Sequence, residues 1–190
     1  KVKVSVYKIY ENNILAFMNS NRYNEWWSEE SGSGWVYNDY DLERYGNVVL
    51  NQEYNTRDLP KTKGMSLLSM NFDDEIPFRG IYLITAQSTE NQWIKATKLV
   101  SVSDIGLIAR TGSDEVMVFT NSVKEATPLQ RVTVSVISSN NQVLFSGTTN
   151  GEGMVKFTGL QSKYKEFSPA LITARNGNDF NYMLLSDTRV

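Results

Sequence analysis

The sequence predicts an all-β protein made of two consecutive antiparallel β-sandwiches of the immunoglobulin or fibronectin type, with one short helix in the first. Three observations support this fold class: strict alternation in the opening strand, short strand-like segments at regular spacing after Asp104, and a polar break near the middle of the chain. The break divides the chain into expected domains 1–102 and 103–190.

The first expected domain opens on an alternating strand. In "KVKVSVYKIY", Val2, Val4 and Val6 alternate with lysine and serine, which is typical of a strand with one buried face. The next segment, "ENNILAFMNS", groups its apolar residues between asparagines that can cap a helix, so we expect a short helix around 12–19.

The rest of this domain is less regular. Strands are expected near 44–53 and 65–72, and a hairpin pairs 81–86 with a return strand that ends at the break. The stretch 21–41 is rich in aromatic and turn-forming residues and is expected to be an irregular excursion. Within it, the "SEESGSG" segment is the expected site of first proteolytic nicking.

The second expected domain follows the pattern of a seven-stranded sandwich. The expected strands are 105–110, 115–121, 131–138, 142–147, 154–158, 170–175 and 180–185. The turns between them are rich in Gly, Asn, Asp or Pro. Because almost no linker separates the two domains, we expect an oriented pair whose structural junction is Val102, Ser103, Asp104, Ile105 and Gly106. There Asp104 is expected to accept backbone N–H bonds, and Gly106 to allow close packing or an unusual backbone shape.

Composition excludes whole classes of chemistry. The chain has 190 residues, no Cys and no His, which removes thiolate nucleophiles, disulfides, zinc fingers and the usual neutral-pH acid–base group. Its 19 basic and 21 acidic residues give a net charge of −2 without a charged block, so nucleic acid is not an expected partner. We expect no catalytic residue, no metal site, no cofactor and no membrane span in these residues. The start at Lys1, without Met, suggests a piece of a longer chain.

Several segments resemble the early macroglobulin-type domains of bacterial alpha-macroglobulins. The likeness runs from the hairpin residues Gly80, Tyr82 and Leu83 through the "VSDIGL" junction to a "T-x-x-x-G" turn and an "Ala-Arg" strand end. The resemblance covers about residues 78–190, and the junction motif is its strongest evidence. The matching residues after the hairpin are Val102, Ser103, Asp104, Ile105, Gly106, Leu107, Thr149, Gly153, Ala174 and Arg175.

The resemblance implies a non-catalytic scaffold segment of a bacterial cell-envelope protease inhibitor. In such inhibitors a protease cuts a bait segment, and many members trap it through a Cys–Gln thioester; this chain lacks the Cys and shows no obvious bait. The implied location is periplasmic or cell-envelope, with a lipid anchor on the full-length chain as an option. The implied partners are neighbouring domains of the same chain and, for the full-length protein, its target proteases.

Two other readings of the residues stay open. Trp26, Trp27 and Trp35 could form a surface aromatic patch that stacks sugar rings, which would suit a carbohydrate-binding or adhesin-type module. We expect them instead to pack mainly against protein. The acidic clusters 73–75 and 39–41 could bind calcium, but neither follows the spacing of a calcium loop, so solvated turn carboxylates are expected.

Overall fold

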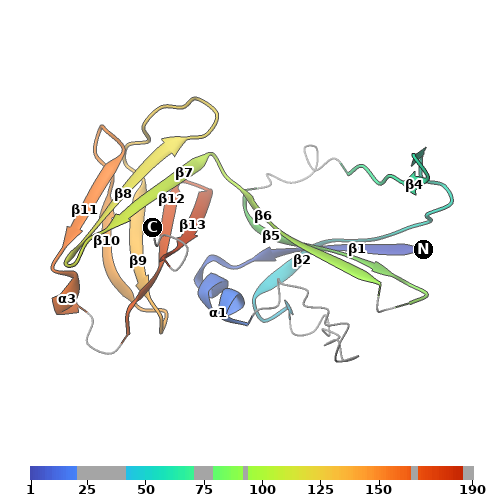
Figure 1. Ribbon diagram of the computed structural model, residues 1–190, viewed down its shortest axis with the longest axis horizontal. Coiled ribbons are helices and arrows are strands. Elements are labelled where there is room, and N and C mark those ends of the chain that lie inside the picture. Colours follow the sequence, from blue (N-terminus) through green and yellow to red (C-terminus); the bar gives the residue numbers. More distant parts are fainter. Residues whose placement is uncertain (21–41, 71–78, 92–93, 164–166, 186–190) are drawn as a thin grey trace. The chain divides into compact units, whose positions relative to one another are not determined.

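The computed structural model describes residues 1–20, 42–70, 79–91, 94–163 and 167–185. Its contacts divide the chain into two compact units, Lys1–Val100 and Ser101–Val190. Both are built from antiparallel strands, with little helix (Figure 1). The all-β fold class is therefore confirmed. The exact domain limits at 102 and 103 stay a prediction.

The first unit is organised around a four-stranded sheet in the order β2-β1-β5-β6. These strands are β1 (Val2–Ile9), β2 (Gly46–Tyr54), β5 (Gly80–Ser88) and β6 (Lys95–Val102). Strand β1 is central and pairs antiparallel with both β2 and β5, so residues far apart in sequence close the sheet. The 3-10 turn η1 (Glu11–Asn13) and helix α1 (Ile14–Asn19) follow β1, close to the predicted helix.

Strand β1 is covered on both faces, which corrects one expectation. Val4 and Val6 are buried as predicted, but Ser5 and Tyr7, which point the opposite way, are also 3% and 2% exposed. The single buried face predicted from the Val/Lys alternation is therefore wrong. Among the described residues this unit has one large sheet with a helix, and the second large sheet of a sandwich does not lie within them.

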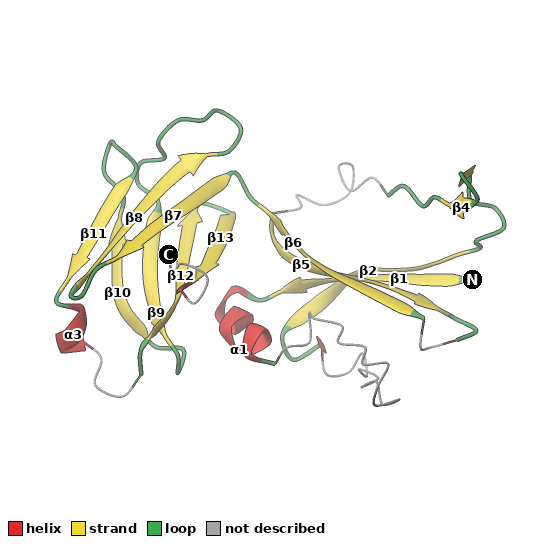
Figure 2. Cartoon of the chain, viewed as in Figure 1, coloured by secondary structure: helices red, strands yellow, loops and turns green. Residues whose placement is uncertain are grey.

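A small hairpin stands apart from this sheet, in the connection between β2 and β5. It consists of β3 (Lys61–Thr62) and β4 (Met65–Ser66), and Figure 2 shows it beyond the end of β2. The predicted strand at 65–72 is thus much shorter than expected in the described residues. The apolar/polar pattern of this segment does not reveal whether a sheet is available to bury its side chains.

The second unit is a sandwich of two sheets, ordered β10-β9-β12-β13 and β11-β8-β7. All seven predicted strands are present, at β7 (Ile105–Thr111), β8 (Glu115–Ser122), β9 (Thr133–Ser138), β10 (Val143–Thr148), β11 (Met154–Thr158), β12 (Pro169–Asn176) and β13 (Asp179–Leu184). Residues of the two sheets, with Val132 just before β9 and Leu160 just after β11, form one core, made of Ile105, Val116, Val118, Val132, Val134, Val136, Phe157, Leu160, Ile172 and Ala174. This is the alternation expected of a sandwich.

A short helix in the second unit was not predicted. Helix α3 (Leu160–Lys163) begins where the Asp114 backbone oxygen accepts the N–H groups of Gly159 and Leu160, and the Asp114 carboxylate accepts that of Gln161. The capping residue lies more than 40 positions upstream, so no local pattern could reveal it.

Candidate functional site

The junction segment Val102–Gly106 lies at the start of the second unit, where β6 ends and β7 begins. Its Ser103 hydroxyl accepts the N–H of Ile105 at 3.0 Å, which tightens the turn. Ile105 is 1% exposed and belongs to the sandwich core. The segment is therefore held in place by the hydrogen bond of Ser103 and by the buried side chain of Ile105.

Asp104 fastens a second loop to this turn. One carboxylate oxygen accepts the Lys124 N–H at 2.9 Å, and both oxygens lie within 3.0 Å of the Ser122 hydroxyl. The Asp104 backbone oxygen also accepts the Val123 N–H at 2.8 Å. These hydrogen bonds favour the ionised form, so the backbone bond from Lys124 and then the Ser122 hydroxyl lower the pKa of Asp104 below its ordinary value.

Strand β13 also forms hydrogen bonds with the junction segment. The Asp179 carboxylate accepts the Asp104 N–H at 3.0 Å, and the Asn181 amide donates to the Ile105 backbone oxygen at 2.7 Å. The Asn181 oxygen in turn accepts the Ser101 hydroxyl at 2.8 Å. This polar cluster joins β7 to β13, which belong to different sheets of the sandwich. The sequence analysis did not identify Asp179 and Asn181, because they reach the junction only when β13, the last strand, lies beside β7, the first strand of the second unit.

Gly106 lies in β7 opposite Asn121 of β8. A Cβ atom at this position would lie 3.3 Å from the Asn121 backbone oxygen and 3.4 Å from the Val123 side chain. Its φ is not in the left-handed region. Of the two expectations for this glycine, the geometry supports close packing. Its structural role in the pair of domains stays a prediction.

The "T-x-x-x-G" turn joins β10 to β11. Thr149, 3% exposed, accepts the Val132 N–H at 3.0 Å and donates to the Leu129 oxygen at 2.7 Å. Gly153 has a φ of 70°, and a Cβ there would lie only 2.4 Å from the Thr120 backbone oxygen. Both motif residues thus fix the turn against a neighbouring loop.

The other candidates fall outside what the structure describes. Trp26, Trp27 and Trp35, and both acidic clusters, lie in 21–41 or 71–78. Over the described ranges, no group of three or more His, Cys, Asp or Glu residues could hold a metal. Nor does the described part of the chain contain a helix long and apolar enough to cross a membrane.

The seven strands in two facing sheets define the class of the second unit, an antiparallel β-sandwich module. Residues 102–190 match the family described as "Bacterial alpha-2-macroglobulin MG3 domain". The second unit is therefore similar to this macroglobulin domain over nearly its whole length, and the resemblance carried by "VSDIGL" is confirmed.

Two relatives each align with about half of the chain. The alpha-2-macroglobulin of Pasteurella multocida is 31% identical over 87 residues, 45% of this chain. An alpha-2-macroglobulin homolog of Yersinia pestis is 26% identical over 95 residues, 50% of this chain. The aligned regions are 5% of the length of each relative.

Solved structures extend the fold comparison to both units. The crystal structure of native Escherichia coli alpha-2-macroglobulin spanning domains NIE-MG1 matches 97% of this chain and 83% of that one, with a TM-score of 0.69 and 20% identity. The trypsin-activated E. coli protein matches 97% of this chain and 12% of that one, with a TM-score of 0.67 and 21% identity. At these identities the likeness shows the fold.

Proposed function

We propose that this chain is a non-catalytic scaffold segment of a bacterial alpha-macroglobulin-like protease inhibitor of the cell envelope. The observation that carries the proposal is the family match over 102–190. Asp104, Thr149 and Gly153 all fix loops through hydrogen bonds or close packing. These contacts support a structural role for the three residues.

The scaffold role agrees with the composition. Covalent trapping through a thioester requires a Cys, which this chain lacks. In the trypsin-activated E. coli structure, the part similar to this chain is 12% of the protein, and a segment of that size would act by holding neighbouring domains in position. Its partners would be those domains, and target proteases would meet the whole inhibitor.

The test compares this chain with the longer parent protein. Each is incubated with trypsin and with elastase, and residual activity is measured on a protein-sized substrate. The parent should protect the substrate, whereas this chain should leave protease activity unchanged and form no adduct that survives a denaturing gel. Stoichiometric inhibition by this chain would contradict the scaffold role. A parent that inhibits neither protease would contradict the inhibitor assignment.

A further inference from the structure

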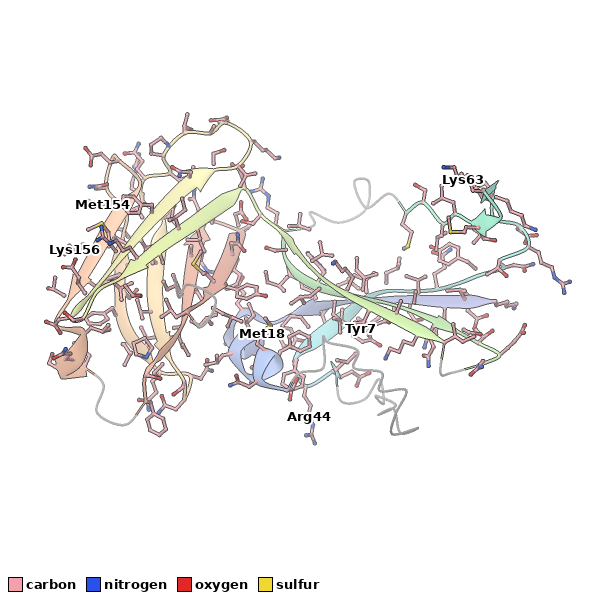
Figure 3. The ribbon with its side chains drawn as sticks, viewed as in Figure 1. Tyr7, Met18, Arg44, Lys63, Met154 and Lys156 are labelled. Atoms are coloured by element: carbon pink, nitrogen blue, oxygen red, sulfur yellow. The ribbon has the colours of Figure 1, made fainter. Side chains whose placement is uncertain are left out.

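The β3–β4 hairpin in the first unit is exposed along its whole length. Every residue from Pro60 to Leu67 is exposed, including apolar Met65 at 69% and Leu67 at 55%. Two of the eight are lysines, Lys61 in β3 and Lys63 in the turn. Figure 3 shows Lys63 at the tip of the hairpin.

The hydrogen bonds that hold this hairpin are local. Its strands pair Lys61 with Ser66 and Thr62 with Met65, and the Leu67 N–H donates to the Pro60 oxygen at 2.8 Å. The Ser66 hydroxyl adds a 3.3 Å bond to the Thr56 oxygen. An isolated two-stranded hairpin without a buried face is at best marginally stable in water. We therefore expect this segment to open at little cost while the four-stranded sheet stays folded.

Such opening exposes a site for one class of protease. We propose that the hairpin is a cleavage site for proteases of trypsin-like specificity, which bind a Lys or Arg side chain against a carboxylate in their pocket. The preferred bond is Lys61–Thr62, because β3 is already extended; the Lys63–Gly64 bond lies in a turn with φ values of 51° and 81°. Water supplies the hydroxyl group to the Lys61 carbonyl carbon and a proton to the departing Thr62 nitrogen.

The sheet topology predicts that the cut chain stays in one piece. Cleavage in the hairpin leaves β1 and β2 on one fragment and β5 on the other. Strand β1 pairs with β5 along its whole length, from Val2 opposite Ser88 to Ile9 opposite Ile81. The two fragments are therefore held together by a central strand ladder and the core around it. This inference does not depend on the proposed function.

The second unit contains a matched control, an exposed loop that is firmly tied. Lys124 is exposed like the hairpin lysines. However, its N–H donates to Asp104 at 2.9 Å, and the neighbouring Val123 N–H donates to the Asp104 oxygen at 2.8 Å. If exposure alone governed cleavage, Lys124 and Lys61 would be cut alike. If local opening governs it, the bond after Lys61 is cut faster than the bond after Lys124.

Limited trypsin digestion of the chain, followed by mass spectrometry of the new termini, tests the proposal. Each rate is divided by the rate for the same bond in a synthetic peptide, which removes the effect of neighbouring residues. On this scale, cleavage after Lys61 or Lys63 should exceed cleavage after Lys124 by at least about tenfold. On native size-exclusion chromatography the two fragments should co-elute. Equal corrected rates, or fragments that separate under native conditions, would overturn the proposal.

Two variants test separately whether cleavage requires the lysine side chains and whether it requires local opening of the hairpin. The double variant Lys61→Gln, Lys63→Gln should remove the cut. Thr62→Cys with Met65→Cys places cysteines at paired positions in a chain that otherwise has none, so that a disulfide can close the hairpin. The oxidised form should resist cleavage at both lysines, and reduction should restore it. Undiminished cleavage of the oxidised form would show that opening is not required, and would contradict the mechanism.

Discussion

The two units cover their sheets in different ways. In the second, two sheets face each other, and β8 buries one side only, through residues such as Val116 and Val118. In the first, the central strand β1 is buried on both sides, with Val6 at 0% and Tyr7 at 2% exposed. The difference shows that alternation in sequence reports one packed face only when the other face meets water.

Among the substitutions that test this difference between the two units, Tyr7→Ala should change the free energy of unfolding most. If the second face of β1 is as closely packed as the first, Tyr7→Ala should destabilise the first unit by about 3–5 kcal/mol, as large aromatic truncations in cores do. Urea unfolding monitored by circular dichroism measures it. Lys98→Ala, on an exposed position of β6, is the control and should change the free energy of unfolding by less than about 0.5 kcal/mol. A loss at Tyr7 as small as that of the control would mean that one face is packed loosely.

In the second unit, the turn glycine should come next. Gly153→Ala forces a Cβ into the left-handed region and to within 2.4 Å of the Thr120 oxygen, so it should cost about 2 kcal/mol or more. Gly151, two residues earlier in the same turn, has open space around its Cβ position. Gly151→Ala should therefore leave the melting temperature almost unchanged. Similar melting temperatures for both variants would refute the close approach at Gly153.

Substitution of Gly106 tests the packing of the junction and should cost less stability than Tyr7→Ala. Gly106→Val pushes a branched side chain toward the Asn121 oxygen and Val123, and should cost about 1–3 kcal/mol. Gly106→Ala should cost less, because a single methyl group needs a shift of only a few tenths of an ångström. Thermal unfolding measures stability, and small-angle scattering detects any change in the angle between the domains. If Gly106→Val left both measurements unchanged, the junction would not be tightly packed.

The smallest expected effect is the pH dependence at Asp104. Hydrogen bonds from Lys124 and Ser122 lower the pKa of its carboxyl in the folded state, so its contribution is complete above the unfolded-state pKa and is lost as pH falls through the folded-state value. The stability difference between the wild type and Asp104→Asn should therefore shrink in acid. Denaturant titrations at neutral pH and at successively lower pH measure this. A difference independent of pH would contradict an ionised Asp104 at the turn.

The sequence predicted the second unit more fully than the first for a physical reason. Its strands form two sheets around one core, so a strand such as β8 shows the alternation in its own sequence, and the turns carry their own Gly, Asn and Asp residues. Asp104 could be chosen because an acidic residue at a turn has a local role. Asp179 and Asn181 could not, since their partners are about 75 residues away and depend on how the sandwich closes.

In the first unit the decisive contacts are distant. Ser5 is polar and lies in an alternating stretch, so its sequence context predicts exposure, and only the surrounding structure buries it. Met65 gives the reverse case, because an apolar residue in a strand-like stretch lies 69% exposed in a small hairpin. Local patterns describe what a segment can bury, whereas the fold decides what covers it.

The central position of β1 also bears on how the chain folds during synthesis. Strand β1 is made before both of its partners, and its second partner, β5, begins only at Gly80. The ribosome must therefore deliver the whole connection before the ladder can form, which makes this sheet slow to nucleate compared with a simple hairpin. Until β2 and then β5 have been synthesised, the edges of β1 carry unpaired backbone groups that can pair with another chain, and Lys3 and Lys8 place positive charges on the strand. We expect these lysines to disfavour pairing of β1 with other chains during synthesis.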